Sequence, residues 1–149
     1  MDNRILDKIV DNILSIKPIL FKNLIKPEMV SHIIPAGSYH LFIILEKHGT
    51  LSMTEIGKEL TMPKPNVTSL IDKLIDSGFV ERIPDLNDRR IVKIQFTISG
   101  KKAIDKAKIF VRENIKEKLL MLSDGELALL ADSLQTVKEI LSKILLKIN

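Results

Sequence analysis

Lysine and arginine are concentrated in one part of this 149-residue sequence, between Glu81 and Lys108. This stretch carries eight cations and four anions, and the excess equals the formal net charge of +4 for the whole chain. Clustered cations of this kind attract the phosphates of a nucleic acid. A lysine-rich helix surface that faces only solvent is the alternative explanation.

Two of these cations, Arg89 and Arg90, stand in a polar run between segments that begin at Phe79 and Val92. Apolar residues recur at every second position in both segments, which predicts a β-hairpin with a charged tip. An arginine at such a tip can enter a narrow, A·T-rich minor groove. The alternative is a surface ion pair between Asp88 and Arg90, normally worth about 0–1 kcal/mol. Both hold together if Asp88 orients Arg90.

Ahead of the hairpin, the sequence predicts two helices joined by a turn. Ser52 and Glu55 have the spacing of a capping box, which starts a helix that runs to about Leu60. The second helix follows a turn with two prolines and ends at Gly78; its expected buried stripe is Val67, Leu70, Ile71 and Leu74. Such a helix-turn-helix with a hairpin can place its second helix in the DNA major groove while the hairpin touches the flanking backbone.

Several polar residues lie off the apolar stripe of the second helix: Lys64, Asn66, Thr68, Ser69 and Lys73. Asparagine pairs bidentately with adenine, and serine or threonine bonds to bases or contacts a thymine methyl group. The free amides at the helix N-terminus face phosphate. Ser52 and Thr54 are further phosphate candidates, although capping explains Ser52 equally well. A merely solvated helix face is the alternative.

The N-terminal part of the sequence frames this unit. An apolar pattern with alternating steps of three and four predicts a helix over 4–25, which Pro18 should kink or break near Lys17. Ser38 is expected to cap a helix from Tyr39 to Lys47.

The C-terminal part is expected to hold two long helices. Thr97 or Ser99 caps the first, and a capping box that begins at Ser123 opens the second. From Leu127 to Ile148 the second carries an uninterrupted heptad pattern and is apolar well beyond it. So much apolar surface must be covered, and a second copy of the chain is the natural partner.

Other classes of function find no support in the sequence. It contains no cysteine, no paired histidines at ligand spacing, no Gly-rich phosphate loop and no hydrolase motif. We therefore expect no enzyme activity, no cofactor and no metal site. Charged residues interrupt the apolar N-terminal run, so it reads as neither a signal peptide nor a membrane span, and a cytoplasmic location without membrane contact is the default.

The run Asp85-Leu86-Asn87-Asp88-Arg89-Arg90, followed by the alternating segment to Gly100, closely resembles the wing signature of MarR-type transcriptional regulators. The stretch from Asn66 to Leu74 is similar to the recognition helix of that family. The resemblance covers essentially the entire chain. It implies a mainly α fold with a small β-hairpin wing, in a single domain. Residues 1–34 and 100–149 would form dimerisation helices and 36–98 a DNA-binding lobe, with the helix-turn-helix at 52–77 and the wing at 79–98.

This resemblance also implies a function and roles for particular residues. Arg90 corresponds to the minor-groove arginine of the family, and Asp88 to the acid that braces the wing; Arg89 belongs to the same contact surface. The implied function is a homodimeric, ligand-responsive repressor of a pseudo-palindromic operator in double-stranded DNA. A small-molecule effector would bind between the dimerisation helices and the lobe, near 32–42 and the first helix, although no ligand-binding residue can be assigned.

Two departures from the family pattern matter: Pro63 stands where Ser or Thr often caps the recognition helix, and Ser69 where Arg is common. Leu86 also replaces the commoner Pro, a change of little expected consequence. The first two departures leave a second hypothesis open, a winged-helix protein-interaction module without DNA binding.

Overall fold

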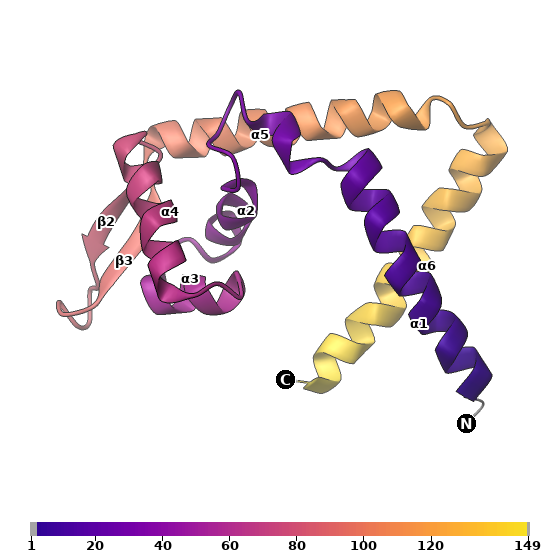
Figure 1. The fold of residues 1–149 in the computed structure, drawn as a ribbon, viewed down its shortest axis with the longest axis horizontal. Helices are drawn as coiled ribbons and strands as arrows, with labels where there is room; N and C mark the ends of the chain where they lie inside the picture. The colour runs from indigo at the N-terminus through magenta and orange to yellow at the C-terminus, as the bar shows by residue number, and fades with distance from the viewer. Residues whose placement is uncertain (1–2, 149) are drawn as a thin grey trace. The chain divides into compact units, whose positions relative to one another are not determined.

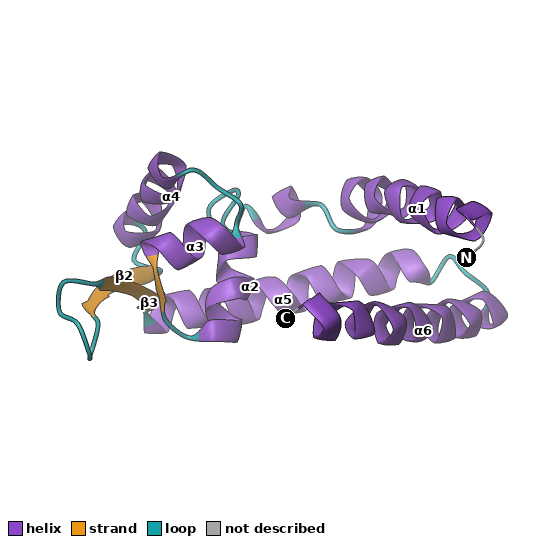
Figure 2. Ribbon diagram, turned by 90° about the horizontal axis from the view of Figure 1, so that it is seen from below, coloured by secondary structure: helices purple, strands orange, loops and turns teal. Residues whose placement is uncertain are grey.

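The computed structural model of this chain describes residues 3–148 (Figure 1). They form two compact units that divide between Arg112 and Glu113. The fold is mainly α with one small antiparallel sheet, as the sequence predicts (Figure 2). Within the described residues, no helix combines the length and the apolar character that crossing a membrane requires.

The first unit begins with three helical segments: α1 (Asn3–Pro18), the π-helical η1 (Ile19–Leu24) and the 3-10 helical η2 (Pro27–Val30). The expected break at Pro18 is present, because the α-helix ends there and the chain continues with π-helical bonding. A proline inside a helix removes one backbone donor and crowds the preceding turn, which favours such a change. No residue of α1 is buried.

The lobe has its core around α2 (Tyr39–His48), whose residues Leu41, Phe42, Ile44 and Leu45 are buried as expected. The Phe42 ring packs edge-on against Phe79 and Phe96, with ring centroids 5.9 and 5.0 Å away. Gly49 ends the helix with a φ of 79°, a value that suits glycine. Ser38 occupies the predicted N-cap position, but its hydroxyl makes no cap bond and instead donates to the Pro35 carbonyl at 2.5 Å. Ser38 therefore closes the preceding turn.

The helix-turn-helix consists of α3 (Met53–Glu59) and α4 (Lys64–Asp76). The predicted capping box is confirmed: the Glu55 amide donates to the Ser52 hydroxyl at 3.3 Å, and the Ser52 amide donates to the Glu55 carboxylate at 2.7 Å. That amide bond holds the pKa of Glu55 below its usual value. In α4, Val67, Ile71 and Leu74 are buried, whereas Leu70 is only half-buried, so the apolar stripe is narrower than expected.

The sheet contains one more strand than the sequence predicts. Strands β2 (Val80–Pro84) and β3 (Val92–Phe96) form the expected hairpin, with Val80 opposite Phe96 at its base and Pro84 opposite Val92 near its tip. The third strand, β1 (Leu51–Ser52), pairs with the outer edge of β3 and joins the start of α3 to the wing. A two-residue strand is too short to show a period of two.

The turn between α3 and α4 holds a backbone conformation that its residue type disfavours. Thr61 has a φ of 50°, in the left-handed region that β-branched residues rarely occupy. We expect Thr61→Asn to stabilise the protein by about 0.5–1 kcal/mol in urea unfolding, because asparagine tolerates this region. The same substitution at Thr54, an exposed residue of α3, should be nearly neutral. A loss of stability in Thr61→Asn would show that the threonine side chain is required there.

Helix α5 (Ile98–Leu119) follows strand β3 directly in the sequence. The Gly100 amide donates to the Thr97 hydroxyl at 3.0 Å, so Thr97 rather than Ser99 is the cap. The Thr97 hydroxyl in turn donates to the Gly78 carbonyl at 2.6 Å, and its amide donates to the Phe79 carbonyl at 3.0 Å. These bonds tie the start of α5 to the end of the helix-turn-helix.

The second unit holds the end of α5 and helix α6 (Asp124–Ile148). Its predicted capping box is confirmed, with the Ser123 amide donating to the Glu126 carboxylate at 2.8 Å and the Glu126 amide to the Ser123 hydroxyl at 3.4 Å. The heptad residues Leu134, Val137, Leu141 and Ile144 are each 40–53% exposed, so the single chain leaves this seam uncovered.

Candidate nucleic-acid interface

The wing tip is a tightly bonded loop organised by Asp85. One carboxylate oxygen of Asp85 accepts the amides of Asn87 and Asp88 at 2.8 and 3.0 Å. The other oxygen pairs with the Lys93 ammonium at 2.7 Å, and both side chains are largely covered, at 10% and 30% exposure. The backbone closes the loop twice more, from the Asp85 amide to Ile91 and from the Ile91 amide to Asp88. The loop is thus held by its own bonds rather than by packing.

Asp88 has a narrower role than the one expected for it. Its carboxylate accepts the Arg90 amide at 3.0 Å and lies 3.5 Å from the Arg90 Nε. Asp88 therefore orients Arg90, as the sequence suggests, while Asp85 makes most of the bonds that brace the wing. The Arg90 side chain is 95% exposed and free to meet a partner. The sequence signal for Asp85 was its position two and three residues before the amides it binds, which is typical of an Asx turn.

The electrostatics of this loop follow from its contacts. The Lys93 ammonium, with the Asp88 and Asn87 amides, lowers the pKa of Asp85 from 3.8 to about 2. Asp85 reciprocally raises the pKa of Lys93. Because the pKa of Asp85 is depressed on folding, its stabilising effect is fully present above its ordinary value and is lost as the pH falls through about 2.

We expect the Asn87 and Asp88 amide resonances of the intact protein to shift with a midpoint near pH 2. Asp85→Asn keeps an oxygen that can accept both amides but removes the charge, so this titration should vanish in an NMR pH series while the loop stays formed. A midpoint near the ordinary carboxyl value would contradict the ion pair with Lys93.

The N-terminus of α4 offers fewer free amides than the sequence suggests. The Asn66 and Val67 amides both donate to the Pro63 carbonyl, at 3.0 and 3.1 Å, and Pro65 has no amide hydrogen. Pro63 occupies the cap position without a side-chain bond. Any DNA contact by this helix must therefore rely on side chains more than on its free amides.

Two shallow depressions flank Met62 and collect most of the candidate side chains of the helix-turn-helix. Asn66, Ser69 and Lys73 line one of about 250 Å³, together with the loop 35–37. Thr54 and Lys64 line the other, of about 300 Å³. The remaining candidates are engaged elsewhere: Thr68 is half-buried and its hydroxyl donates to the Lys64 carbonyl at 3.0 Å, while Ser52 caps α3.

The basic stretch is partly neutralised in the fold. Five of its eight cations make ion pairs: Arg82 with Asp72, Lys93 with Asp85, Lys101 and Lys108 with Glu46, and Arg90 with Asp88. The Glu46 pairs join α2 to α5, and the Lys108 ammonium holds the pKa of Glu46 below its usual value. Much of the charge excess therefore serves the fold, both in the hairpin and in the first half of α5.

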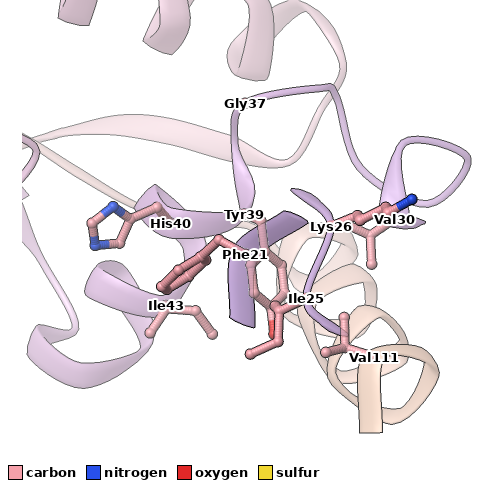
Figure 3. Close-up of a pocket in the computed structure, with 9 residues that line it drawn as sticks. All are labelled: Phe21, Ile25, Lys26, Val30, Gly37, Tyr39, His40, Ile43 and Val111. Carbon is pink, nitrogen blue, oxygen red and sulfur yellow. The ribbon is translucent and has the colours of Figure 1, made fainter. Parts of the chain in front are cut away.

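A separate cavity of about 470 Å³ lies in the first unit, beside the lobe (Figure 3). Its lining residues come from η1, the segment around η2, the start of α2 and Val111 of α5: Phe21, Ile25, Lys26, Val30, Gly37, Tyr39, His40, Ile43 and Val111. Figure 3 shows the His40 imidazole directed away from the apolar side chains. Burial raises the pKa of the Tyr39 hydroxyl. Of the expected region 32–42, His32 and Phe42 do not line this cavity: His32 meets Phe110 edge-on, and Phe42 is in the core.

Among the described residues, no group of three histidine or acidic side chains is placed to hold a metal ion.

Comparison with known proteins finds one family model that matches part of the chain. The MarR family model matches residues 34–92. The chain is 39% identical over 62 residues to the HTH-type transcriptional regulator YfiV of Bacillus subtilis, a match that spans 42% of this chain and only 39% of that protein. It is 29% identical over 107 residues to the HTH-type transcriptional regulator BilQ of Clostridioides difficile, covering 70% of each.

The fold extends the likeness over nearly the whole chain. The crystal structure of transcriptional regulator Tm0710 from Thermotoga maritima superimposes with a TM-score of 0.72, covering 91% of this chain and 96% of that one at 23% identity. The two relatives are named as transcriptional regulators, which agrees with the expectation that the chain is not an enzyme. The MarR family model thus matches the region that holds the helix-turn-helix and most of the wing, and over nearly the whole chain the fold is similar to that of a solved transcriptional regulator.

Proposed function

We propose that this chain is a sequence-specific DNA-binding repressor that reads a pseudo-palindromic operator as a homodimer. The observation that carries the proposal is the wing: a loop held rigid by Asp85 presents Arg90 with 95% of its side chain exposed. A hairpin tip held by its own hydrogen bonds, with one exposed guanidinium, suits insertion into a narrow minor groove, because the loop backbone loses little conformational freedom on binding.

The proposed DNA contacts divide between the wing and the helix-turn-helix. Arg90 enters the minor groove with Asp88 orienting it, and Arg89 contacts the neighbouring backbone. Asn66 and Ser69 line the same depression and would face base edges, with Thr68 beside them. Lys64, Lys73 and Thr54 would contact phosphates, and Ser52 would contribute mainly by capping α3.

Dimerisation is proposed from the apolar surfaces of α1 and α6, each of which is uncovered in the single chain. Five apolar residues of α1 are 42–51% exposed: Leu6, Ile9, Val10, Ile13 and Ile16. The α6 seam is exposed to a similar degree. We assign residues 1–34 and 100–149 to dimerisation and 36–98 to the DNA-binding lobe.

Sedimentation should give a particle of about twice the chain mass of 16.9 kDa, and Leu134→Lys should shift the measured mass toward that of the monomer.

The 470 Å³ cavity is the proposed effector site. Its size is that of ordinary ligand pockets, and its walls are mostly apolar, which suits a largely apolar small molecule. A compound that binds there would raise the melting temperature of the wild type. Ile43→Trp, which fills the cavity, should abolish that shift. A broad thermal-shift screen without any stabilising compound would count against an effector. We also propose that the protein acts in the cytoplasm, without membrane contact and without a cofactor.

Two observations favour the competing hypothesis of a protein-interaction module. The Asn66 and Val67 amides near the start of α4 are bonded to the Pro63 carbonyl, and Asp72 of α4 is paired with Arg82 at 2.6 Å, so this helix is less suited to DNA than the wing.

Selection of duplexes from a randomised library separates the two functions. A dimeric repressor should enrich one sequence with two symmetric half-sites about 34–36 Å apart, and footprinting should show two protected half-sites one helical turn apart. A library that stays random after selection would support the interaction module instead.

A further inference from the structure

The wing carries an exposed apolar side chain in addition to Arg90: Leu86 is 99% exposed. Single exposed apolar residues are common on protein surfaces and need no explanation by themselves. The position of Leu86 is more informative than its exposure. It stands at the tip of the hairpin between Asp85 and Asn87, on the same loop as Arg90.

The loop around Leu86 is fixed on both sides. Asp85 pairs with Lys93, and its carboxylate also accepts the amides of Asn87 and Asp88. Leu86 therefore keeps its place without any packing of its own side chain. Truncating it should leave the wing intact, because the bonds that hold the loop involve neighbouring residues and backbone groups.

An exposed leucine at this place matches the chemistry of the minor groove. The groove walls are deoxyribose rings, and proteins that bind there use leucine and other apolar side chains against sugars and base steps. Apolar surface gains free energy in proportion to the area removed from water, so a fully exposed leucine has the most to gain. An arginine inserted into the same groove would bring the hairpin tip, and Leu86 with it, close to the sugars.

We propose that Leu86 is a second minor-groove contact, which packs on the deoxyribose walls beside the Arg90 site and strengthens the preference for A·T pairs there. This inference rests on the proposed DNA binding and adds a residue to it. The discrimination has a steric source, because the exocyclic amino group of guanine occupies the floor of the minor groove. A polar group at that place would keep the leucine from its full contact.

The test uses Leu86→Ala in the full chain, with a duplex that the wild type selects from a randomised library. With A·T pairs beneath the wing, the variant should bind about tenfold more weakly. Its thermal unfolding and its salt dependence should match the wild type, because an apolar contact displaces no counterion. Leu86→Met should restore most of the affinity.

Ile98→Ala is the matched control, since Ile98 is 79% exposed but follows the base of the hairpin, at the opposite end from the tip. It should bind like the wild type.

Changing the base pairs beneath the wing tests the groove directly. Inosine·cytosine pairs present the minor-groove edge of A·T but the major-groove edge of G·C, because inosine lacks the amino group. The affinity ratio of wild type to Leu86→Ala should stay near its A·T value on inosine·cytosine flanks and approach one on G·C flanks.

Equal ratios on all three flanks would overturn the inference, as would wild-type affinity in Leu86→Ala or an effect that comes with a lower melting temperature. If the wild type itself selects no duplex, the proposed function fails as well, so the two failures are distinguishable.

Discussion

Arg90→Ala is expected to weaken binding to the selected operator on the order of a hundredfold or more, while the dimer stays folded. A specific arginine contact is worth about 1–3 kcal/mol, and a dimer loses two of them. The free energy of unfolding should hardly change, because the Arg90 side chain is 95% exposed and its Asp88 contact is a surface ion pair. Fluorescence anisotropy at fixed salt measures the affinity, and thermal unfolding checks the fold.

Two further variants identify the cause of this effect. Arg90→Lys keeps the charge but loses the planar guanidinium, so it should recover only part of the affinity. Arg112→Ala removes an exposed cation of α5 outside the wing and should have little effect. If Arg90→Ala bound as tightly as the wild type, the wing would not be a DNA contact.

Gly100→Ala, near the start of α5, should be strongly destabilising. A Cβ at Gly100 would lie 1.8 Å from the Phe79 carbonyl oxygen, 2.8 Å from its carbon and 2.9 Å from the Phe96 ring. The same oxygen accepts the Thr97 amide, so the methyl group would push apart the bond that joins α5 to the hairpin base. Overpacking typically costs about 1–3 kcal/mol, and we expect about 3 kcal/mol or more because backbone must move. The melting temperature should fall by roughly 6–12 °C.

Gly125→Ala is the control for this prediction. Nothing lies within 4 Å of a Cβ at Gly125, in the first turn of α6. Alanine should be neutral or slightly stabilising there, since glycine weakens helices by about 0.5–1 kcal/mol. Equal effects at both glycines would mean that Gly100 acts through chain entropy and not through the close approach of α5 to Phe79.

The helices and the hairpin could be predicted from the sequence because their signals are local. The capping boxes at Ser52 and Ser123, the stops at Gly49 and Gly78 and the change of period at Phe79 each involve a few neighbouring residues. Such signals set φ and satisfy end groups within a turn, so tertiary packing rarely overrides them.

Features that depend on distant residues could not be predicted in this way. The strand β1 exists only because β3 lies beside it, and Glu46 meets Lys108 from 62 residues away. The missing cap bond of Ser38 has a local cause instead: the Pro35 carbonyl, three residues earlier, accepts the hydroxyl, and the residue type alone does not reveal this competition. In the candidate site, Arg90 could be predicted from its sequence pattern. The role of Asp85 in bracing the wing could not, because it depends on the ion pair with Lys93 from the opposite strand of the hairpin.

The central claim, that this chain binds DNA through a cationic surface, is tested most directly by titrating the selected operator across a salt series. Six or more phosphate contacts in the dimer should give a steep negative slope and about a thousandfold loss of affinity between about 50 and 200 mM salt. Arg90→Ala should make the slope shallower. Absence of binding at low salt, or an affinity that does not change with salt, would contradict the account and favour a protein-interaction module.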